Sequence, residues 1–354
     1  MTAAVQRSVF AVALLLTLPL AAQTTTPSPD APSIKAGMMI LADYTYVASV
    51  APPVLDADGN EIHPNAFNVS RAYLNVMGNL NRYISFRVTS EVARETGSSS
   101  LNGSQTLRLK YAYAQFNLDQ WLTKGSWIKA GMNQTPWIEY EESIYRYRLQ
   151  GPIFVDREGF LFPSDNGVAF HYNLPRDFGD VQAGVYNGEG WAHSDPNNEK
   201  ALQIRAAVRP MPAQPVLRGL RVAGFYDLDH YAAGLPRKRA IALVTFEHPR
   251  VNVGIDLLST DDRPSFTVSE TRTHGSSIWA TPKFGKGWEA LLRHDVLRTQ
   301  NSTARKSRDI EGIAYWLPLE AGLTSAVMLD RDASSGPASG THTTSYGIKI
   351  QISY

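Results

Sequence analysis

Most of this chain consists of short segments in which apolar and polar residues alternate. The clearest covers residues 345–354, where every second residue is apolar or aromatic: Tyr346, Ile348, Ile350, Ile352 and Tyr354. Successive side chains of a β-strand point to opposite faces, so this segment has one apolar face and one polar face. A single strand of this kind suits a soluble sheet as well as a membrane wall. The recurrence of the pattern, and the connections between its copies, must decide the fold.

The alternation recurs from Lys35 to the end of the chain. Clear segments lie at 69–79, 85–95, 107–118, 201–209 and 219–228, and weaker ones at 36–47, 125–134, 166–174, 180–187, 239–247, 250–259, 275–284, 287–297, 308–317 and 321–331. With 345–354, the sequence predicts about sixteen strands of about ten residues, which is typical of transmembrane β-barrels. In 107–118 the alternation places Tyr111 and Tyr113 on the apolar face, opposite Arg108 and Lys110. No amphipathic helix of any length is predicted.

The connections between these segments alternate between long and short. The long ones are predicted at 48–68, 96–106, 135–165, 188–199, 229–238, 260–274, 298–307 and 332–343. The exception on the short side is 210–218, a nine-residue turn with three prolines. Short periplasmic turns, long outer loops and an even strand number are typical of outer-membrane barrels, which also pair every backbone amide. The predicted fold is therefore an all-β, transmembrane antiparallel β-barrel, with a secreted β-sandwich or propeller as the soluble alternative.

The N-terminus predicts export. Residues 1–22 have the composition of a signal peptide, with Arg7, an apolar run over 9–20, and Ala21-Ala22 before the cut. Residues 23–33 are predicted to be a flexible leader, and 34–354 the barrel in the outer membrane. Cysteine is absent, which suits passage through the periplasm unfolded. The net charge of +1 gives no indication of nucleic acid binding.

The longest connection, at 135–164, is rich in aromatic residues. Trp137, Tyr140, Tyr145, Tyr147 and Phe154 would be unusual in a solvated loop. By strand count it is the third outer loop, and we expect it to pack against the inner wall of the barrel. The alternative is an ordinary surface loop that packs on its neighbours or on another subunit.

Several segments resemble the phosphate-selective porin O and P family. They are Ser70 to Tyr73, Ser85 to Arg87, Trp127 to Pro136, and Ser164 to Ala169. The closing segment is similar to the last strand of outer-membrane barrels, although Tyr354 stands where Phe is most frequent. The resemblance implies a homotrimer whose third outer loop folds into the pore. Some members of the family carry an arginine ladder and a lysine cluster for phosphate, and that cluster is not identified in this sequence.

Charged residues are predicted to line the lumen on the faces opposite the apolar ones. From the strands these are Arg71, Arg87, Arg108, Lys110, Lys129, Arg205 and Arg221; from the loop they are Glu139, Glu141, Glu142, Arg146 and Arg148. Acidic residues are also predicted to face inward: Glu91, Asp227, Asp256, Glu289, Asp295 and Glu311. Charges in a pore select ions by sign, and here they favour a mild anion preference. Alternatively, these charges only keep the lumen wet.

The predicted function is an outer-membrane porin through which small hydrophilic solutes diffuse, phosphate being one candidate. Neither a catalytic motif nor a metal-ligand spacing is found among the eight scattered histidines, so no enzyme activity, cofactor or metal is predicted. The expected partners are solutes, membrane lipid and two further copies of the chain. The alternatives are a secreted soluble enzyme, a carbohydrate-binding protein, or a closed barrel that acts as an adhesin.

Overall fold

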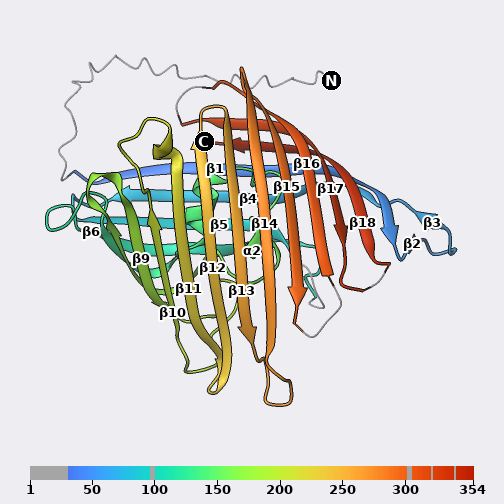
Figure 1. Cartoon of the computed structure of the whole chain (residues 1–354), viewed down its shortest axis with the longest axis horizontal. Coiled ribbons are helices and arrows are strands. Elements are labelled where there is room, and N and C mark those ends of the chain that lie inside the picture. The colour runs from blue at the N-terminus through green and yellow to red at the C-terminus, as the bar shows by residue number, and fades with distance from the viewer. Residues whose placement is uncertain (1–30, 96–99, 301–304, 320–321, 339) are drawn as a thin grey trace, which may run out of the picture.

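The computed structural model describes residues 31–95, 100–300, 305–319, 322–338 and 340–354. The predicted signal peptide at 1–22 lies outside the described residues, as does most of the predicted leader at 23–33, and both stay predictions. Sixteen antiparallel strands form one closed barrel (Figure 1). The sixteen-stranded barrel predicted from the alternating segments is thereby confirmed.

The barrel strands follow one another in chain order. They are β1 (Ser33–Ala51), β4 (Asn65–Asn79), β5 (Ile84–Arg94), β6 (Gln105–Asn117), β7 (Trp127–Gln134), β8 (Ser164–Asn173), β9 (Gly179–Tyr186), β10 (Ala201–Val208), β11 (Leu220–Ala232), β12 (Leu235–His248), β13 (Val251–Asp262), β14 (Thr271–Gly285), β15 (Trp288–Thr299), β16 (Arg305–Trp316), β17 (Thr324–Ser335) and β18 (His342–Ser353). A small hairpin of β2 (Val54–Leu55) and β3 (Glu61–Ile62) lies in the first long connection. We call the end that holds the start of β1 and the end of β18 the periplasmic end.

The barrel closes between its first and last strands. β1 pairs with β18 in a register that sets Ala42 opposite Ile350. The N–H of Tyr354 donates to the carbonyl of Met38, and the N–H of Met38 donates to the carbonyl of Tyr354, each at 2.9 Å. Closure leaves the sheet without a free edge, so the backbone of every strand is paired within the wall.

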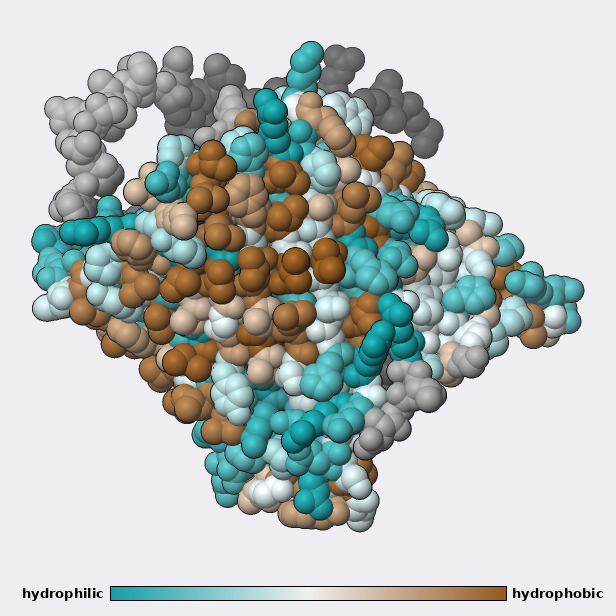
Figure 2. All heavy atoms as spheres, in the orientation of Figure 1, coloured by the Kyte–Doolittle hydropathy of each residue, from teal (hydrophilic) through white to brown (hydrophobic). Residues whose placement is uncertain are grey.

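The two faces of the wall differ in the way the alternation predicts. Ile348 and Ile350 face outward and are 45% and 39% exposed, whereas Gln351 between Ile350 and Ile352 is buried on the inner side. In Figure 2 the outward side chains that face the viewer form a broad apolar band, with hydrophilic residues beyond it. This arrangement matches a lipid-facing wall around a polar lumen.

The prediction for 107–118 is wrong in its second half. The pairing of β5 with β6 shifts between Thr89 and Ser90, because β6 carries one extra residue at Lys110. A β-bulge of this kind reverses the facing of the residues that follow it. Tyr111 and Tyr113 therefore face the lumen, together with Arg108 and Lys110, instead of the lipid.

The outer connections are less uniform than predicted. Between β11 and β12 the structure has a two-residue turn, Ala233-Gly234, where a loop at 229–238 was expected. Gly234 has φ of 76°, which a tight hairpin turn requires and glycine adopts without strain. Both strands continue outward past the predicted bounds, and their pairing shifts register between His230 and Ala232. The periplasmic connection predicted at 210–218 covers residues 209–219 in the structure and contains a 3₁₀ turn, Leu217–Gly219.

The long connection between β7 and β8, residues 135–163, lies inside the barrel. It contains α1 (Ile138–Ile144) and α2 (Phe154–Arg157), the latter visible behind the front strands in Figure 1. We call this segment the inner loop. Its apolar side chains form the main buried cluster among the described residues, together with side chains of β1 and of β10 to β17. No helix among the described residues has both the length and the apolar character needed to cross a bilayer.

Candidate functional site: the lumen and its inner loop

Aromatic residues hold one side of the inner loop against the wall. Trp137, Tyr145 and Tyr147 are almost completely buried. The ring of Tyr145 meets Trp279 of β14 at 5.3 Å between centroids, and the ring of Tyr147 meets Trp316 of β16 at 5.7 Å. Buried aromatic pairs of this kind contribute both area and orientation. The expectation that these aromatic residues pack inside the barrel is confirmed.

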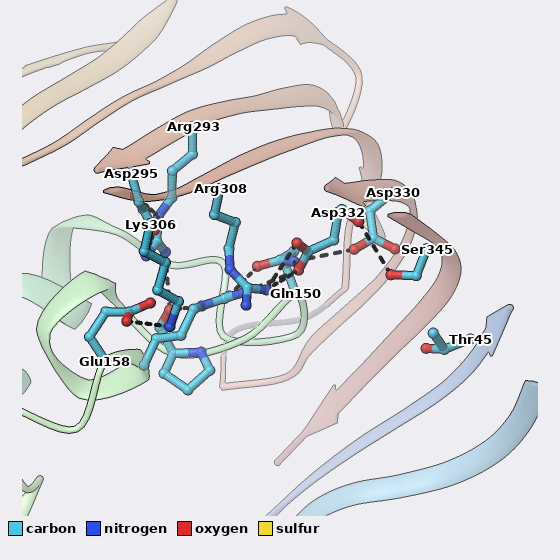
Figure 3. A network of polar contacts seen from close by, with 12 residues as sticks. Thr45, Gln150, Glu158, Arg293, Asp295, Lys306, Arg308, Asp330, Asp332 and Ser345 are labelled. Atoms are coloured by element: carbon cyan, nitrogen blue, oxygen red, sulfur yellow. Dashed lines mark hydrogen bonds and ion pairs between the residues drawn. The ribbon is translucent and has the colours of Figure 1, made fainter. Parts of the chain in front are cut away.

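A polar network fixes the second half of the inner loop to β15, β16 and β17 (Figure 3). The carboxylate of Asp332 accepts from Arg157 at 3.2 Å, from Gln150 at 3.2 Å and from Arg308 at 2.9 Å. Nearby, Lys306 donates to Glu158 at 2.6 Å. Asp332 thus joins two side chains of the loop to one of the wall, and charge-assisted bonds of this kind are the stronger ones.

Two carboxyl groups meet where α1 contacts the wall. Glu141 accepts from the indole N–H of Trp137 at 2.8 Å and faces Asp256 of β13. Neither carboxyl is exposed to water, and the nearby guanidinium of Arg293 is bound to Asp295 at 2.7 Å. Burial, and then the adjacent Asp256, raise the pKa of Glu141 well above its usual range.

On the opposite side of the lumen, β4 to β7 carry a group of cationic side chains. We call Arg71, Arg87, Lys110 and Lys129 the basic wall. Arg71 and Lys110 both form ion pairs with the carboxylate of Glu91. The ammonium of Lys110 lies 3.1 Å from a carboxylate oxygen of Glu91. Tyr73 lies beside them, and its hydroxyl accepts from Lys110 at 3.1 Å. This wall holds four cations and one carboxylate.

Arg87 and Lys129 have no acidic partner among the described residues. Arg87 donates to Thr89 at 2.9 Å and to Asn75 at 3.1 Å, and its guanidinium lies 4.5 Å from the centre of the Tyr111 ring. Lys129 donates to Gln134 at 2.9 Å, with its ammonium 4.7 Å from the centre of the Tyr113 ring. Aromatic faces stabilise cations without supplying a negative counter-charge.

The three acidic residues of α1 have three different surroundings. Glu139 is exposed and has no ion pair in the described structure. Glu141 is buried against Asp256, and Glu142 forms an ion pair with Arg148. Arg148 also donates to the hydroxyl of Tyr73 at 2.9 Å, so it connects the loop to β4. The predicted acidic run therefore presents one free carboxylate to the lumen.

The remaining predicted lumen cations are paired with acidic groups. Arg146 pairs with Glu289, Arg108 with Glu95, and Arg221 with Glu247 at 2.6 Å. Arg205 pairs with Asp180 and donates to the carbonyl of Pro136 at 2.9 Å, so it lies beneath the loop.

The inward placement of Glu311 is wrong. Its side chain points outward, is 53% exposed and pairs with Arg331. The reason is the register of β16, in which Ile310 and Ala314 face inward and are buried. Of the described residues, no three His, Asp or Glu side chains are placed to hold a metal ion.

A family model, phosphate-selective porin O and P, matches residues 53–232, just over half of the chain. The chain belongs to this family. This porin is also similar in structure to an anion-selective porin from Comamonas acidovorans, with a TM-score of 0.63 at 12% identity over 91% of this chain and 100% of that one. The outer-membrane channel DcaP of Acinetobacter baumannii is similar with a TM-score of 0.61 at 11% identity, over 92% of this chain and 99% of that one. A trimer form of OmpT from Vibrio cholerae is similar with a TM-score of 0.56 at 10% identity, over 92% of this chain and 100% of that one. No curated protein matches the sequence.

The family and the barrel place this porin in the bacterial outer membrane, where it acts as a passive-diffusion channel. Its lumen has features that the sequence did not reveal. Tyr111 and Tyr113 became lumen residues through a bulge that alternation cannot predict. Asp332 was assigned no role, since nothing near it in the sequence indicates that Gln150 and Arg157 lie beside it.

Proposed function

We propose that small hydrophilic solutes cross this porin between the inner loop and the basic wall, without catalysis and with a mild preference for anions. Phosphate is one candidate among small anions. The observation that carries the proposal is the composition of the basic wall, where one carboxylate faces four cations. A few unbalanced charges in a narrow, low-dielectric pore outweigh many charges at its wide mouths.

The acidic residues of the other half of the barrel support this proposal by their position beneath the inner loop. Asp256, Asp295 and Asp330 lie on strands that the loop covers. They therefore act on the loop more than on a solute. Exposure alone does not separate the two sides, because Lys110 and Lys129 of the basic wall are themselves 2% and 5% exposed. Glu139 is the free carboxylate that opposes the basic wall, and it moderates the preference without reversing it.

The test is the reversal potential across a salt gradient in planar bilayers. Wild-type porin should show anion selectivity, and Arg87→Ala combined with Lys129→Ala should reduce or abolish it. The matched control is Arg298→Ala combined with Arg305→Ala, which removes two cations from the outer ends of β15 and β16. Cation selectivity of the wild type, or an equal effect in both double variants, would refute the anion preference.

We also propose that the porin assembles as a homotrimer. The family resemblance implies this, and one structurally similar protein is described in a trimer form. The mass of the protein in mild detergent, measured by light scattering, should correspond to three chains and fall to one chain after boiling. A monomer that conducts ions would refute the trimer and leave the channel function intact.

A further inference from the structure

A polar cavity of about 210 Å³ lies at the outer side of the lumen, between the end of the inner loop and the wall. Its lining comes from segments that are far apart in the sequence: the inner loop at 159–162, Asp165 of β8, the connection at 187–200, and β10 to β12. The cavity has room for several water molecules or for one small solute. It is separate from the basic wall, which lies on β4 to β7.

Both guanidinium groups that line the cavity are engaged by the protein itself. Arg237 pairs with Asp229 at 2.5 Å. Arg239 pairs with Asp262 at 2.8 Å and donates to the carbonyl of Phe160 at 3.2 Å. The cavity therefore offers no unpaired cation to an anionic solute.

The two buried side-chain atoms of the lining that lack a partner are both acceptors. Asp227 and Gln203 are register partners on β11 and β10, and they are 4% and 6% exposed. Oδ1 of Asp227 and Oε1 of Gln203 have no hydrogen-bond partner among the described residues. Asp165, in contrast, accepts from the N–H groups of Asn166 and Gly188, each at 2.6 Å. A buried acceptor without a donor costs free energy, and a carboxylate costs more than an amide.

The charge of the lining indicates what kind of donor would fit. Three aspartates, Asp165, Asp227 and Asp229, line the cavity with two arginines, so the ionised lining has one negative charge in excess. An ammonium group has three hydrogen-bond donors, no acceptor and one positive charge.

We propose that this cavity is a binding site for small solutes that carry an ammonium group, which donates to Asp227 and Gln203. The site goes beyond the anion pathway proposed above, and it differs from that pathway in its position and in the sign of its charge. A bound ammonium group supplies the donor that both buried oxygens lack, through charge-assisted hydrogen bonds to the carboxylate.

The test compares three probes of nearly equal size by saturation-transfer NMR on the porin in detergent: n-propylammonium, 1-propanol and propionate. The wild type should bind propylammonium saturably and about tenfold more tightly than either other probe, the order expected for one hydrogen bond to a charged group.

Two matched variants locate the site. Asp227→Asn keeps the shape of the side chain and removes its charge, so it should abolish the preference for propylammonium over propanol. Asp330→Asn is the control, because Asp330 on β17 is 7% exposed and also has an unpartnered Oδ1, but does not line the cavity. It should keep the wild-type preference. Conductance in planar bilayers shows that each variant is folded.

Absence of saturable propylammonium binding, or equal binding of propylammonium and propanol by the wild type, would overturn the inference. A preference that persists in Asp227→Asn, or that is lost equally in Asp330→Asn, would also overturn it. The reversal potential is measured separately, so failure of this site is distinguishable from failure of the proposed anion preference.

Discussion

At the scale of single residues, a carboxyl pair decides how the inner loop meets the wall. Glu141 and Asp256 cannot both be ionised without placing two like charges in a dry contact, with Arg293 already bound to Asp295. Protonation of Glu141 removes that repulsion, so we expect the stability of this contact to depend on pH.

The stability of the porin should therefore fall as pH rises through the titration of Glu141. The pKa of Glu141 is raised in the folded state, so between the ordinary value of 4.5 and the raised value the folded state binds more protons than the unfolded state. The free energy of unfolding then decreases by up to about 1.4 kcal/mol per pH unit in that window. Urea unfolding in detergent at several pH values should show this slope in the wild type and a smaller one in Glu141→Gln.

Glu142→Gln is the matched control, since Glu142 is partly exposed and paired with Arg148. It should keep the wild-type slope. If Glu141→Gln and Glu142→Gln change the slope equally, the buried pair is not the group that titrates.

At the scale of elements, the inner loop depends on its polar anchors as well as on its aromatic residues. Asp332→Asn should leave Arg157 and Arg308 without a carboxylate and lower the free energy of unfolding by about 1.5–3 kcal/mol, the range for hydrogen bonds to charged groups. A freer loop should also make brief closures of the channel more frequent in single-channel recordings. Asp177→Asn, which breaks an exposed pair with Arg209 at the periplasmic end, should change neither property. Unaltered recordings for Asp332→Asn would show that the network does not hold the loop.

Because of the bulge in β6, the residues that face lipid after it are the ones that simple alternation would place in the lumen. Ala112 lies opposite Val88 and faces lipid, whereas Gln115 faces the lumen. Ala112→Arg should therefore destabilise the barrel by about 2–4 kcal/mol, as charges at mid-membrane on a lipid face do. Gln115→Arg should be tolerated. Heat denaturation in detergent, followed by electrophoretic mobility, distinguishes the two, and the opposite ranking would mean that β6 is not bulged.

At the scale of the whole molecule, the seam between β1 and β18 joins residues about three hundred positions apart. Ala42 and Ile350 are register partners there, and paired residues of antiparallel strands lie within disulfide range. Ala42→Cys combined with Ile350→Cys should form a disulfide on oxidation and raise the heat-denaturation midpoint without changing conductance, because the bond restricts the unfolded chain. The reduced form and each single variant are the controls. Failure to cross-link would argue against closure at this register.

The sequence by itself determined the architecture, because alternation is a local property that each strand carries in its own residues. Ser345 to Tyr354 shows its two faces without any knowledge of its neighbours, and the recurrence of that pattern predicted the barrel and its strand number. The aromatic content of 135–164 likewise predicted a loop that packs inside, since exposed tryptophan and tyrosine clusters are unfavourable in water.

Only the tertiary structure decided which charges act on the lumen. The acidic run of α1 reads as one feature in the sequence, yet Glu139 is free, Glu141 is buried against Asp256, and Glu142 is paired. Those differences come from strands more than a hundred residues away or from a turn of the loop, and local patterns carry no information about them. The bulge in β6 turned Tyr111 and Tyr113 into the lumen, and the register of β16 turned Glu311 outward. A shift of one residue reverses the facing of every side chain after it.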